Sequence, residues 1–270
     1  MTEAGWDQPG PSRPGNYAEQ AATYDRTRGA SPTIVRRLLA QLGPADGRSL
    51  LDIAGGTGNY AEALSQEGFR PVVFDASFEM IARSVGKIGS GRQVVGDAAA
   101  LPFEDGSFDC ATCVVAIHLF ADRGGAFREA CRVLQDGPLV VVAYTRENLE
   151  ALFVHEYFGG RWPEGGGFSA ADVRGELGGA GFRRVEVGTF VYDDAVAGSL
   201  VAMHTDARLL ADPERLRNTS FWHRLPEDIR TRGVERLAAD LKSGVLASRV
   251  RDSLQRAAEV GHGTVFACWT

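Results

Sequence analysis

The sequence of 270 residues predicts an α/β protein built on a doubly wound, Rossmann-like sheet. Short apolar runs alternate with amphipathic segments through the first half of the chain, and these runs are rich in valine. Strands that are apolar along their whole length are typical of a parallel sheet covered by helices on both faces. Right-handed crossovers between such strands make the sheet doubly wound.

The expected elements of the first half follow one another in regular alternation. A helix is expected over residues 31–43, where leucine and isoleucine recur at helical spacing behind Ser31 and Pro32. Amphipathic helices should follow the first two strands, the second of them beginning at Ser77, and GGAFREACRVL predicts another. The expected strands are SLLDIA (49–54), PVVFD (71–75), RQVVG (92–96), FDCATCVVAI (108–117) and PLVVVAYT (138–145).

The second half of the chain changes character after Thr145. A short helix is expected from Ser169 to about Gly179, and the alternating segment 182–194 predicts a strand. Residues 195–258 are almost all helical by pattern, and a last strand should follow at 261–269, so the helices would form a lid inserted between two late strands. The expected divisions are a flexible leader at 1–15, a core at 16–145, an aromatic segment with a helix and the sixth strand at 146–193, the lid at 194–260 and the last strand at 261–270.

The composition is that of an ordinary globular protein, with 44% hydrophobic and 24% charged residues. The net charge of −6 and the lack of any run of Lys or Arg disfavour a nucleic-acid partner, because nucleic-acid binding depends on neutralising phosphates. No apolar stretch reaches the roughly 18–20 residues that span a bilayer, so no membrane association is expected. The first residues have no basic start and no apolar run, which predicts a cytoplasmic location.

A metal site is not expected. Cys110 and Cys113 lie three residues apart in a predicted strand, where their side chains would point to opposite faces. No second cysteine pair or histidine cluster accompanies them, so we expect buried, inert thiols. His204 and His223 could ligate a metal only if a carboxylate joined them in space.

The central signal is a glycine loop between the first strand and the helix that follows it. Gly55, Gly56 and Gly58 would let the backbone approach a ligand closely, and the helix N-terminus favours negative groups. The spacing from Gly56 through Gly58 to Ala61 also fits the fingerprint of dinucleotide-binding proteins. The loop alone therefore leaves the ligand open.

Three carboxylates narrow the choice of ligand. Asp52 lies just before the loop, where it would disfavour a pyrophosphate and favour a ligand with ammonium and sulfonium charges. Asp75 ends the second strand, where a carboxylate can accept both hydroxyls of an adenosine ribose. Asp97, at the end of the third strand, could accept from an adenine amino group. Each has a structural alternative: Asp52 could tie down the glycine loop, and Asp75 and Asp97 could cap a helix or turn.

With these residues the sequence resembles the class I S-adenosylmethionine-dependent methyltransferases, especially the branch of the ubiquinone/menaquinone C-methyltransferases. The matching stretches are LLDIAGGTGNYAEAL, VVFDASFEMIARS, GDAAALPFEDGSFDCATCVVAIHLF and EACRVLQDGPLVVVAY, within about residues 48–145. The resemblance implies a seven-stranded, mostly parallel sheet with an antiparallel last strand. It also implies that Gly56 and Gly58 line the methionine part of the cofactor, Asp75 the ribose, and Asp97 with Ala98 the adenine.

The resemblance extends to further positions and has one departure at the loop. The family's first loop glycine is Ala54 here, which could shift the loop slightly. In similar enzymes an N-terminal helix with an aromatic and a basic residue closes over the cofactor, which suggests Tyr24 and Arg28; a solvated helix packed on the core is the alternative. The cofactor-binding residues expected are Tyr24, Arg28, Asp52, Ala54, Gly55, Gly56, Gly58, Asp75, Ala76, Asp97, Ala98 and Val115.

The acceptor side is less defined, because methyl transfer can proceed by holding the acceptor in line, with a base needed only when a proton must leave. His118, at the end of the fourth strand, is a candidate base, with a role as pocket wall as the alternative. Aromatic residues after the fifth strand could hold a flat acceptor or form the seam between lid and sheet. The substrate-binding residues expected are Tyr17, His118, Tyr144, Tyr157 and Trp162.

The sequence thus predicts an S-adenosylmethionine-dependent methyltransferase, with S-adenosylhomocysteine as product, acting on O, N or C of a small molecule. Secondary metabolism or a quinone-like pathway would suit such an enzyme, as a monomer or homodimer. The alternatives are a protein that binds the cofactor without transferring methyl, as a sensor or a scaffold for other chemistry, and a nicotinamide-dependent oxidoreductase. Methylation of nucleic acid or protein lacks a basic groove in this chain.

Overall fold

In the part of the chain that the structure describes, seven strands form one sheet in the order β3-β2-β1-β4-β5-β7-β6. The computed structural model describes residues 25, 27–160, 167–194, 196, 198–223 and 225–270. The strands are β1 Ser49–Ile53, β2 Arg70–Asp75, β3 Gln93–Val95, β4 Cys110–Val114, β5 Pro138–Ala143, β6 Arg184–Phe190 and β7 Gly263–Trp269. The ladders from β3 to β5 are parallel, whereas β7 runs antiparallel to both β5 and β6. The predicted doubly wound sheet with an antiparallel last strand is confirmed.

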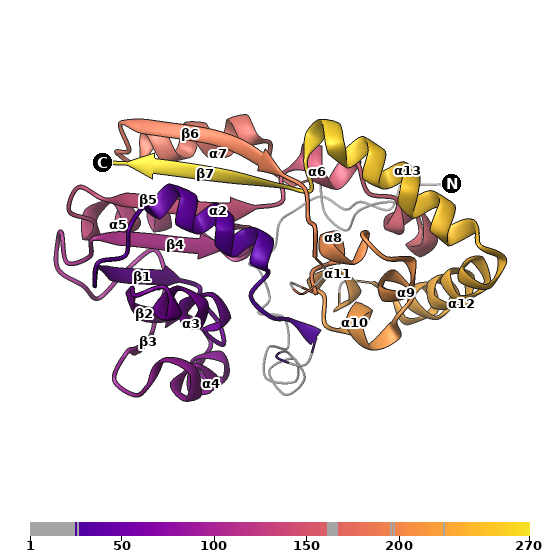
Figure 1. Cartoon of the computed structure of the whole chain (residues 1–270), viewed down its shortest axis with the longest axis horizontal. Coiled ribbons are helices and arrows are strands. Elements are labelled where there is room, and N and C mark those ends of the chain that lie inside the picture. The colour runs from indigo at the N-terminus through magenta and orange to yellow at the C-terminus, as the bar shows by residue number, and fades with distance from the viewer. Residues whose placement is uncertain (1–24, 26, 161–166, 195, 197, 224) are drawn as a thin grey trace, which may run out of the picture.

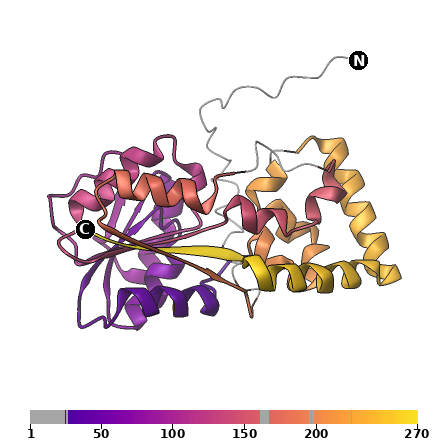
Figure 2. The same ribbon diagram turned by 90° about the horizontal axis from the view of Figure 1, so that it is seen from above.

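Helices cover the two faces of this sheet, as Figure 2 shows. They are α2 Pro32–Leu42, α3 Asn59–Gln66, α4 Phe78–Ile88, α5 Arg123–Val133 and α7 Ala170–Gly179. Apolar side chains of α5 and α7 join one buried cluster with the sheet, and those of α2 and α3 join a second cluster on the opposite face. The local signals act as expected: the Ser31 side chain accepts from the Ile34 N–H and Pro32 occupies the first turn of α2.

The fourth strand is shorter than predicted. The apolar run to residue 117 predicts a continuous strand, but β4 ends at Val114, and Val115 has a φ of 53°. A left-handed backbone turns the chain out of the strand, and the short 3-10 helix η1 Ile117–Leu119 follows.

The buried cysteines agree with the expectation of inert thiols, since burial raises the pKa of the Cys110 thiol to about 11.

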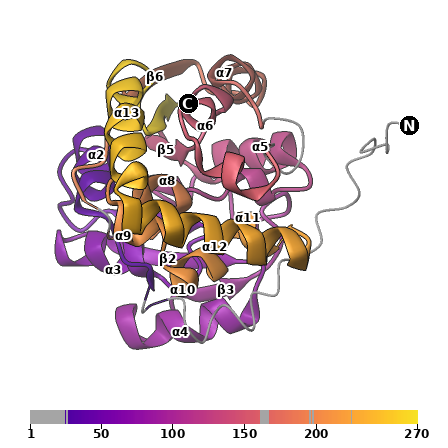
Figure 3. The same cartoon turned by 90° about the vertical axis from the view of Figure 1, so that its right-hand side faces the viewer.

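Among the described residues, six helices lie between β6 and β7 and form a separate body beside the sheet (Figure 1). They are α8 Leu200–Met203, α9 Ala207–Leu210, α10 Pro213–Arg217, α11 Ser220–His223, α12 Glu227–Ser243 and α13 Val245–Val260. Figure 3 shows α12 and α13 outermost. The predicted helical insertion is confirmed.

The apolar core of this body includes a second segment of the chain. After β5 come α6 Arg146–Glu150 and the 3-10 helix η2 Val154–Phe158. Residues 153–158 pack into the cluster made by α8 to α13, although the sequence places them outside the lid. Their aromatic side chains find apolar partners there that are distant in sequence. We call α8 to α13 together with residues 153–158 the lid. Within the described part of the chain, a helix that could cross a membrane is not found.

Candidate functional site

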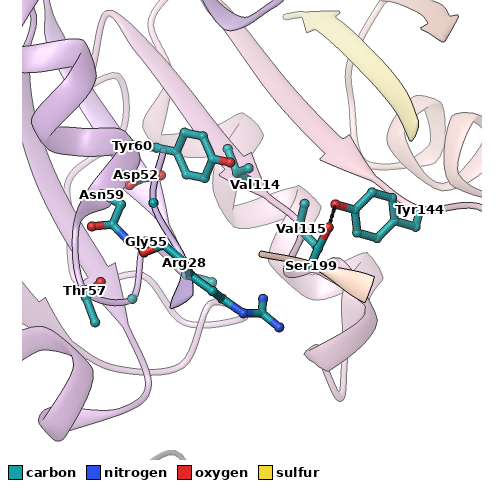
Figure 4. A pocket seen from close by; sticks show the side chains of 13 residues that line it. Arg28, Asp52, Gly55, Thr57, Asn59, Tyr60, Val114, Val115, Tyr144 and Ser199 are labelled. Carbon is teal, nitrogen blue, oxygen red and sulfur yellow. Dashed lines mark hydrogen bonds between the residues drawn. The ribbon is translucent and has the colours of Figure 1, made fainter. Parts of the chain in front are cut away.

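A pocket opens at the carboxyl ends of β1 and β4, where core and lid meet (Figure 4). Its cavity volume is about 80 Å³, and a wider space of about 590 Å³ includes open solvent. Open α/β sheets bind ligands at this edge, beside the point where the strand order reverses. The lining residues are Arg28, Gly29, Asp52, Ala54, Gly55, Gly56, Thr57, Asn59, Tyr60, Val114, Val115, Tyr144 and Ser199.

The glycine loop forms the core side of this pocket. Ala54, Gly56 and Gly58 have φ values of 55°, 58° and 78°, so the chain takes a left-handed backbone three times in five residues. Ala54, which stands where the resembling family has glycine, adopts this backbone at a steric cost. A Cβ on Gly55 would lie 2.5 Å from Asp52 Oδ2, and one on Gly58 would lie 2.9 Å from the Ser84 Cβ. The loop therefore requires small residues for packing as well as for ligand approach.

Asp52 is a buried carboxylate that lines the pocket from below the loop. Its Oδ1 accepts a hydrogen bond from the Thr112 hydroxyl at 2.9 Å, and the backbone N–H of Ala61 also stabilises the charged carboxylate, whereas Oδ2 has no hydrogen-bond partner of ordinary geometry among the described residues. Burial raises the pKa of Asp52 to about 7, with the bond from Thr112 opposing the shift and the charge of Asp75 adding to it. A cationic ligand group in the pocket would supply the missing partner and favour the ionised form.

Asp75, half-buried at the end of β2, joins the loop to the next turn. Its Oδ2 accepts from the Gly56 N–H at 2.9 Å and its Oδ1 from the Ser77 N–H at 2.8 Å. Burial raises the pKa of this carboxyl above its ordinary value. The helix cap of α4 is the Ser77 side chain, which accepts from the Met80 N–H. Asp75 is thus not the cap itself, and it stands at the strand end where a ribose acceptor is expected.

Asp97 and its neighbours lie beside the pocket along the same sheet edge. The Gly96 N–H donates to the Asp75 carbonyl at 3.1 Å, which brings the ends of β3 and β2 together. Asp97 is exposed and its Oδ1 accepts from the Ala99 N–H at 3.0 Å, so the turn-capping role is present. Ala76 is exposed and Ala98 half-buried, and Asp75, Ala76, Asp97 and Ala98 are not among the residues that line the pocket.

Val115 and His118, which follow β4, differ in their position relative to the pocket. Val115 lines the pocket in its left-handed conformation, with its N–H bonded to the Val142 carbonyl at 2.7 Å. A β-branched residue at positive φ is strained, and such strain clusters at ligand sites. His118 is exposed in η1 and lies outside the lining residues.

Of the aromatic residues expected at the acceptor side, the structure brings one to the pocket. Tyr144 lines it from the end of β5. Tyr157 is buried in the lid core, where its hydroxyl donates to Asp240 Oδ2 at 2.6 Å. That position matches the seam-forming alternative, because the ring packs among apolar residues. Tyr17, Tyr24 and Trp162 lie outside the described residues.

Arg28 connects the pocket to the lid. Its guanidinium extends across the pocket (Figure 4) and donates to the Asn218 carbonyl at 2.7 Å. Its own carbonyl accepts from the Asn59 side chain at 3.2 Å. Nearby, Asp25 accepts from the Thr57 hydroxyl at 2.7 Å. The segment around Arg28 thus touches both the glycine loop and the lid.

Sequence reasoning missed several lining residues. Thr57, Asn59 and Tyr60 follow the loop glycines directly, and their polar groups at a helix start were a usable signal. Ser199 is the N-cap of α8 and accepts from the Ala202 N–H at 3.1 Å. A serine before an apolar run predicts a cap, but no pattern indicates that this cap reaches the pocket.

Comparison with known proteins finds similarity to methyltransferases. A family model described as a methyltransferase domain matches residues 51–142. The ubiquinone/menaquinone biosynthesis C-methyltransferase of Escherichia coli O1:K1 is 34% identical over 116 residues, which are 39% of this chain and 46% of that enzyme. The chain thus spans about half the length of the curated relatives it matches.

Solved structures share the fold over most of the chain. A candidate methyltransferase from an antibiotic biosynthesis pathway of Anabaena variabilis aligns with a TM-score of 0.76 at 24% identity, covering 90% of this chain and 99% of the other. The [4+2]-cyclase SpnF aligns with a TM-score of 0.59 at 19% identity, covering 97% and 96%. At these identities the likeness concerns the fold alone. The family match concerns residues 51–142, and the likeness of fold extends over most of the chain.

Proposed function

We propose that the protein transfers a methyl group from S-adenosylmethionine to a small-molecule acceptor. The observation that carries this proposal is Asp52, a buried carboxylate among the residues that line the pocket, whose Oδ2 has no hydrogen-bond partner among the described residues. A buried carboxylate oxygen without a donor costs free energy, and a ligand ammonium would offset that cost. A dinucleotide would instead bring its pyrophosphate to this loop, where the carboxylate would repel it.

The residues present fit the cofactor along the sheet edge. Gly55 and Gly56 carry no Cβ, so the backbone of the loop can approach a ligand closely there. Asp52 would hold the ammonium and Arg28 the carboxylate of the methionine part, because guanidinium pairs with carboxylate in a fork. When bound, the cofactor supplies a methyl group on a positively charged sulfur; its transfer leaves a neutral thioether and releases any proton that the acceptor atom carried.

The remaining cofactor contacts extend to the ends of β2 and β3. Asp75 would accept the ribose hydroxyls, with Ala76 beside it. Asp97 would accept from the adenine amino group, while the Ala98 N–H would donate to the ring. The bond from the Gly96 N–H to the Asp75 carbonyl supports this division, because it holds the two strand ends side by side.

The lid favours a small molecule over a polymer surface as acceptor. The pocket is walled by Arg28 and Ser199 in addition to the sheet edge, so an acceptor would be partly enclosed. Val115 and Tyr144 would contact it, and His118 would serve as a base if it turns toward the pocket mouth. Secondary metabolism is a setting in which such acceptors are common, and the fold relative from an antibiotic pathway supports this part of the proposal.

A second candidate is a protein that binds the cofactor as a scaffold for other chemistry. The same fold occurs in a [4+2]-cyclase, and the described lining residues include no histidine or cysteine that would serve methyl transfer as a dedicated base. Product formation with a panel of acceptors separates the two candidates, since the scaffold would bind the cofactor without forming S-adenosylhomocysteine.

Calorimetric titration with S-adenosylhomocysteine and, separately, with NAD tests the proposal. Wild type should bind the homocysteine compound in the micromolar range and not NAD. Asp75→Ala should weaken binding by roughly tenfold to a hundredfold, because the ribose hydroxyls lose a charged acceptor. Asp228→Ala, an exposed carboxylate of α12 paired with Arg232, is the matched control and should bind like wild type. Binding of NAD alone would overturn the proposal.

A further inference from the structure

Three hydroxyl groups from three parts of the fold meet at one wall of the pocket. The Tyr144 hydroxyl lies 2.6 Å from that of Tyr192 and 2.7 Å from that of Ser199. Tyr144 directly follows β5, Tyr192 lies in the connection from β6 to the lid, and Ser199 caps the first lid helix. Figure 4 shows Tyr144 and Ser199 across the pocket from Asp52 and the glycine loop.

The partners of Tyr144 are themselves held in place. Tyr192 is buried, and burial raises the pKa of its phenol above the ordinary value, so the group stays neutral. Its backbone N–H donates to His262 Nδ1 at 3.0 Å. Ser199 is buried and its oxygen accepts from the Ala202 N–H. The Tyr144 hydroxyl is therefore oriented before any ligand arrives, which lowers the entropic cost of a hydrogen bond to it.

The apolar surroundings of the Tyr144 hydroxyl favour a ligand that carries a polar group at this position. Val114 and Val115 supply apolar surface beside it, so water would be displaced when a flat molecule binds. A ligand hydroxyl or amino group can both donate and accept, so it can join this cluster of hydrogen-bonded hydroxyls, whereas an apolar ligand cannot.

We propose that Tyr144, held by Tyr192 and Ser199, is a positioning residue that binds a hydroxyl or amino group of the acceptor. The acceptor is therefore a small phenol, alcohol or amine, with this group facing the wall opposite the glycine loop. This inference rests on the proposed function, because it takes the glycine-loop side of the pocket as the cofactor side. It also gives Ser199 a role beyond capping α8, since the lid contributes to acceptor selection through the bond between Ser199 and Tyr144.

The test uses two probe ligands of the same shape. 4-Nitrophenol and 4-nitrotoluene are titrated into protein saturated with S-adenosylhomocysteine, at a pH where the phenol is neutral. Wild type should prefer 4-nitrophenol about fivefold or more, and Tyr144→Phe should abolish that preference. Tyr157→Phe is the matched control, because it removes a buried hydroxyl with a similar bond from the lid core. It should retain the preference.

A second variant guards against loss of the fold. Tyr144→Phe leaves the Tyr192 hydroxyl without a bond it now makes, so Tyr144→Phe/Tyr192→Phe removes both hydroxyls together. It should also lack the preference while binding S-adenosylhomocysteine. Equal binding of the two probes by wild type, no binding of either, or a preference that survives both variants would overturn the inference. Failure of the homocysteine compound to bind wild type would instead overturn the proposed function.

Discussion

The sheet edge and the lid each bury a titratable side chain, and they do so with different consequences. At the sheet edge, burial raises the pKa of Asp52 to about 7; this residue lines the pocket, and its Oδ2 has no hydrogen-bond partner among the described residues. In the lid, burial lowers the pKa of His204 to about 3, and its Nδ1 lies 2.7 Å from the Leu200 carbonyl, outside the pocket lining. His204 is therefore neutral at pH 7, whereas Asp52 is about half ionised there, and of the two only Asp52 lines the pocket.

The glycine loop at the sheet edge and the lid also differ in how tightly their left-handed residues are packed. Left-handed residues occur in both, for example Gly58 in the loop and Gly244 between α12 and α13. A Cβ at Gly58 would meet the Ser84 side chain, whereas one at Gly244 would meet nothing within 4 Å. Strain at the sheet edge is thus combined with tight packing, and in the lid it only turns the chain. The sheet edge should therefore tolerate change less than the lid.

The largest expected effect on the free energy of unfolding comes from the charge of Asp52 at the sheet edge. A carboxyl whose pKa rises from 3.8 to about 7 on folding binds protons more strongly in the folded state between these values. The free energy of unfolding should therefore fall as the pH rises from about 4 to about 7, in total by something on the order of 4 kcal/mol. Asp52→Asn should reduce this slope and gain about 1–3 kcal/mol at pH 8, since the amide avoids a buried charge.

Urea unfolding across this pH range measures the effect. Asp228→Asn, which removes an exposed carboxylate from the lid, should leave the slope as in wild type. The pKa of Asp75 is also raised by burial, so Asp52→Asn should keep a smaller slope of the same sign. A variant with an unchanged slope would contradict the assignment of the raised pKa to Asp52.

The next largest effect on stability is expected when two glycines of equal backbone conformation are replaced by alanine. Gly58→Ala and Gly244→Ala place the same methyl group at φ values of 78° and 79°. The lid variant should lose about 1 kcal/mol from left-handed strain alone. The loop variant should lose about 2–4 kcal/mol, because overpacking against α4 adds to the strain. Thermal or urea unfolding of the two proteins gives the difference directly, and equal losses would show that packing at Gly58 is loose.

The smallest effect should differ in sign between the two regions. Ala54→Gly relieves the left-handed strain of the loop and should gain about 0.5 kcal/mol, after the higher entropy of the unfolded chain is counted. Ala239→Gly, at an exposed position within α12, should lose about 1 kcal/mol. Urea unfolding of both variants tests this pair. A loss at Ala54 as large as that at Ala239 would mean that the alanine side chain makes a packing contribution greater than its strain.

Much of the core could be predicted because its signals are local. The valine-rich runs around Val73 and Val141 indicate buried parallel strands, and the spacing from Asp52 through Gly58 to Asp75 indicates a loop with carboxylates at neighbouring strand ends. The end of β4 could not be predicted, because Val115 takes a conformation that its β-branched side chain disfavours and only the surrounding structure stabilises.

The acceptor wall of the pocket shows the limit of such signals. Tyr144 and Ser199 are 55 residues apart, and their hydroxyls meet only because the lid returns to the sheet edge after β6. Residues 153–158 join the lid core for a similar reason, since an apolar aromatic run does not indicate which partner will bury it.

By itself, the sequence determined the strand-and-helix alternation, the glycine loop, its flanking carboxylates and the existence of a helical insertion. These depend on periodicity and on backbone freedom, which are properties of neighbouring residues. Only the tertiary structure decided that Asp52 carries an oxygen without a partner among the described residues, that Tyr157 is buried in the lid, and that Ser199 reaches Tyr144. Burial and hydrogen bonding between distant segments depend on how whole elements pack, and no local pattern contains that information.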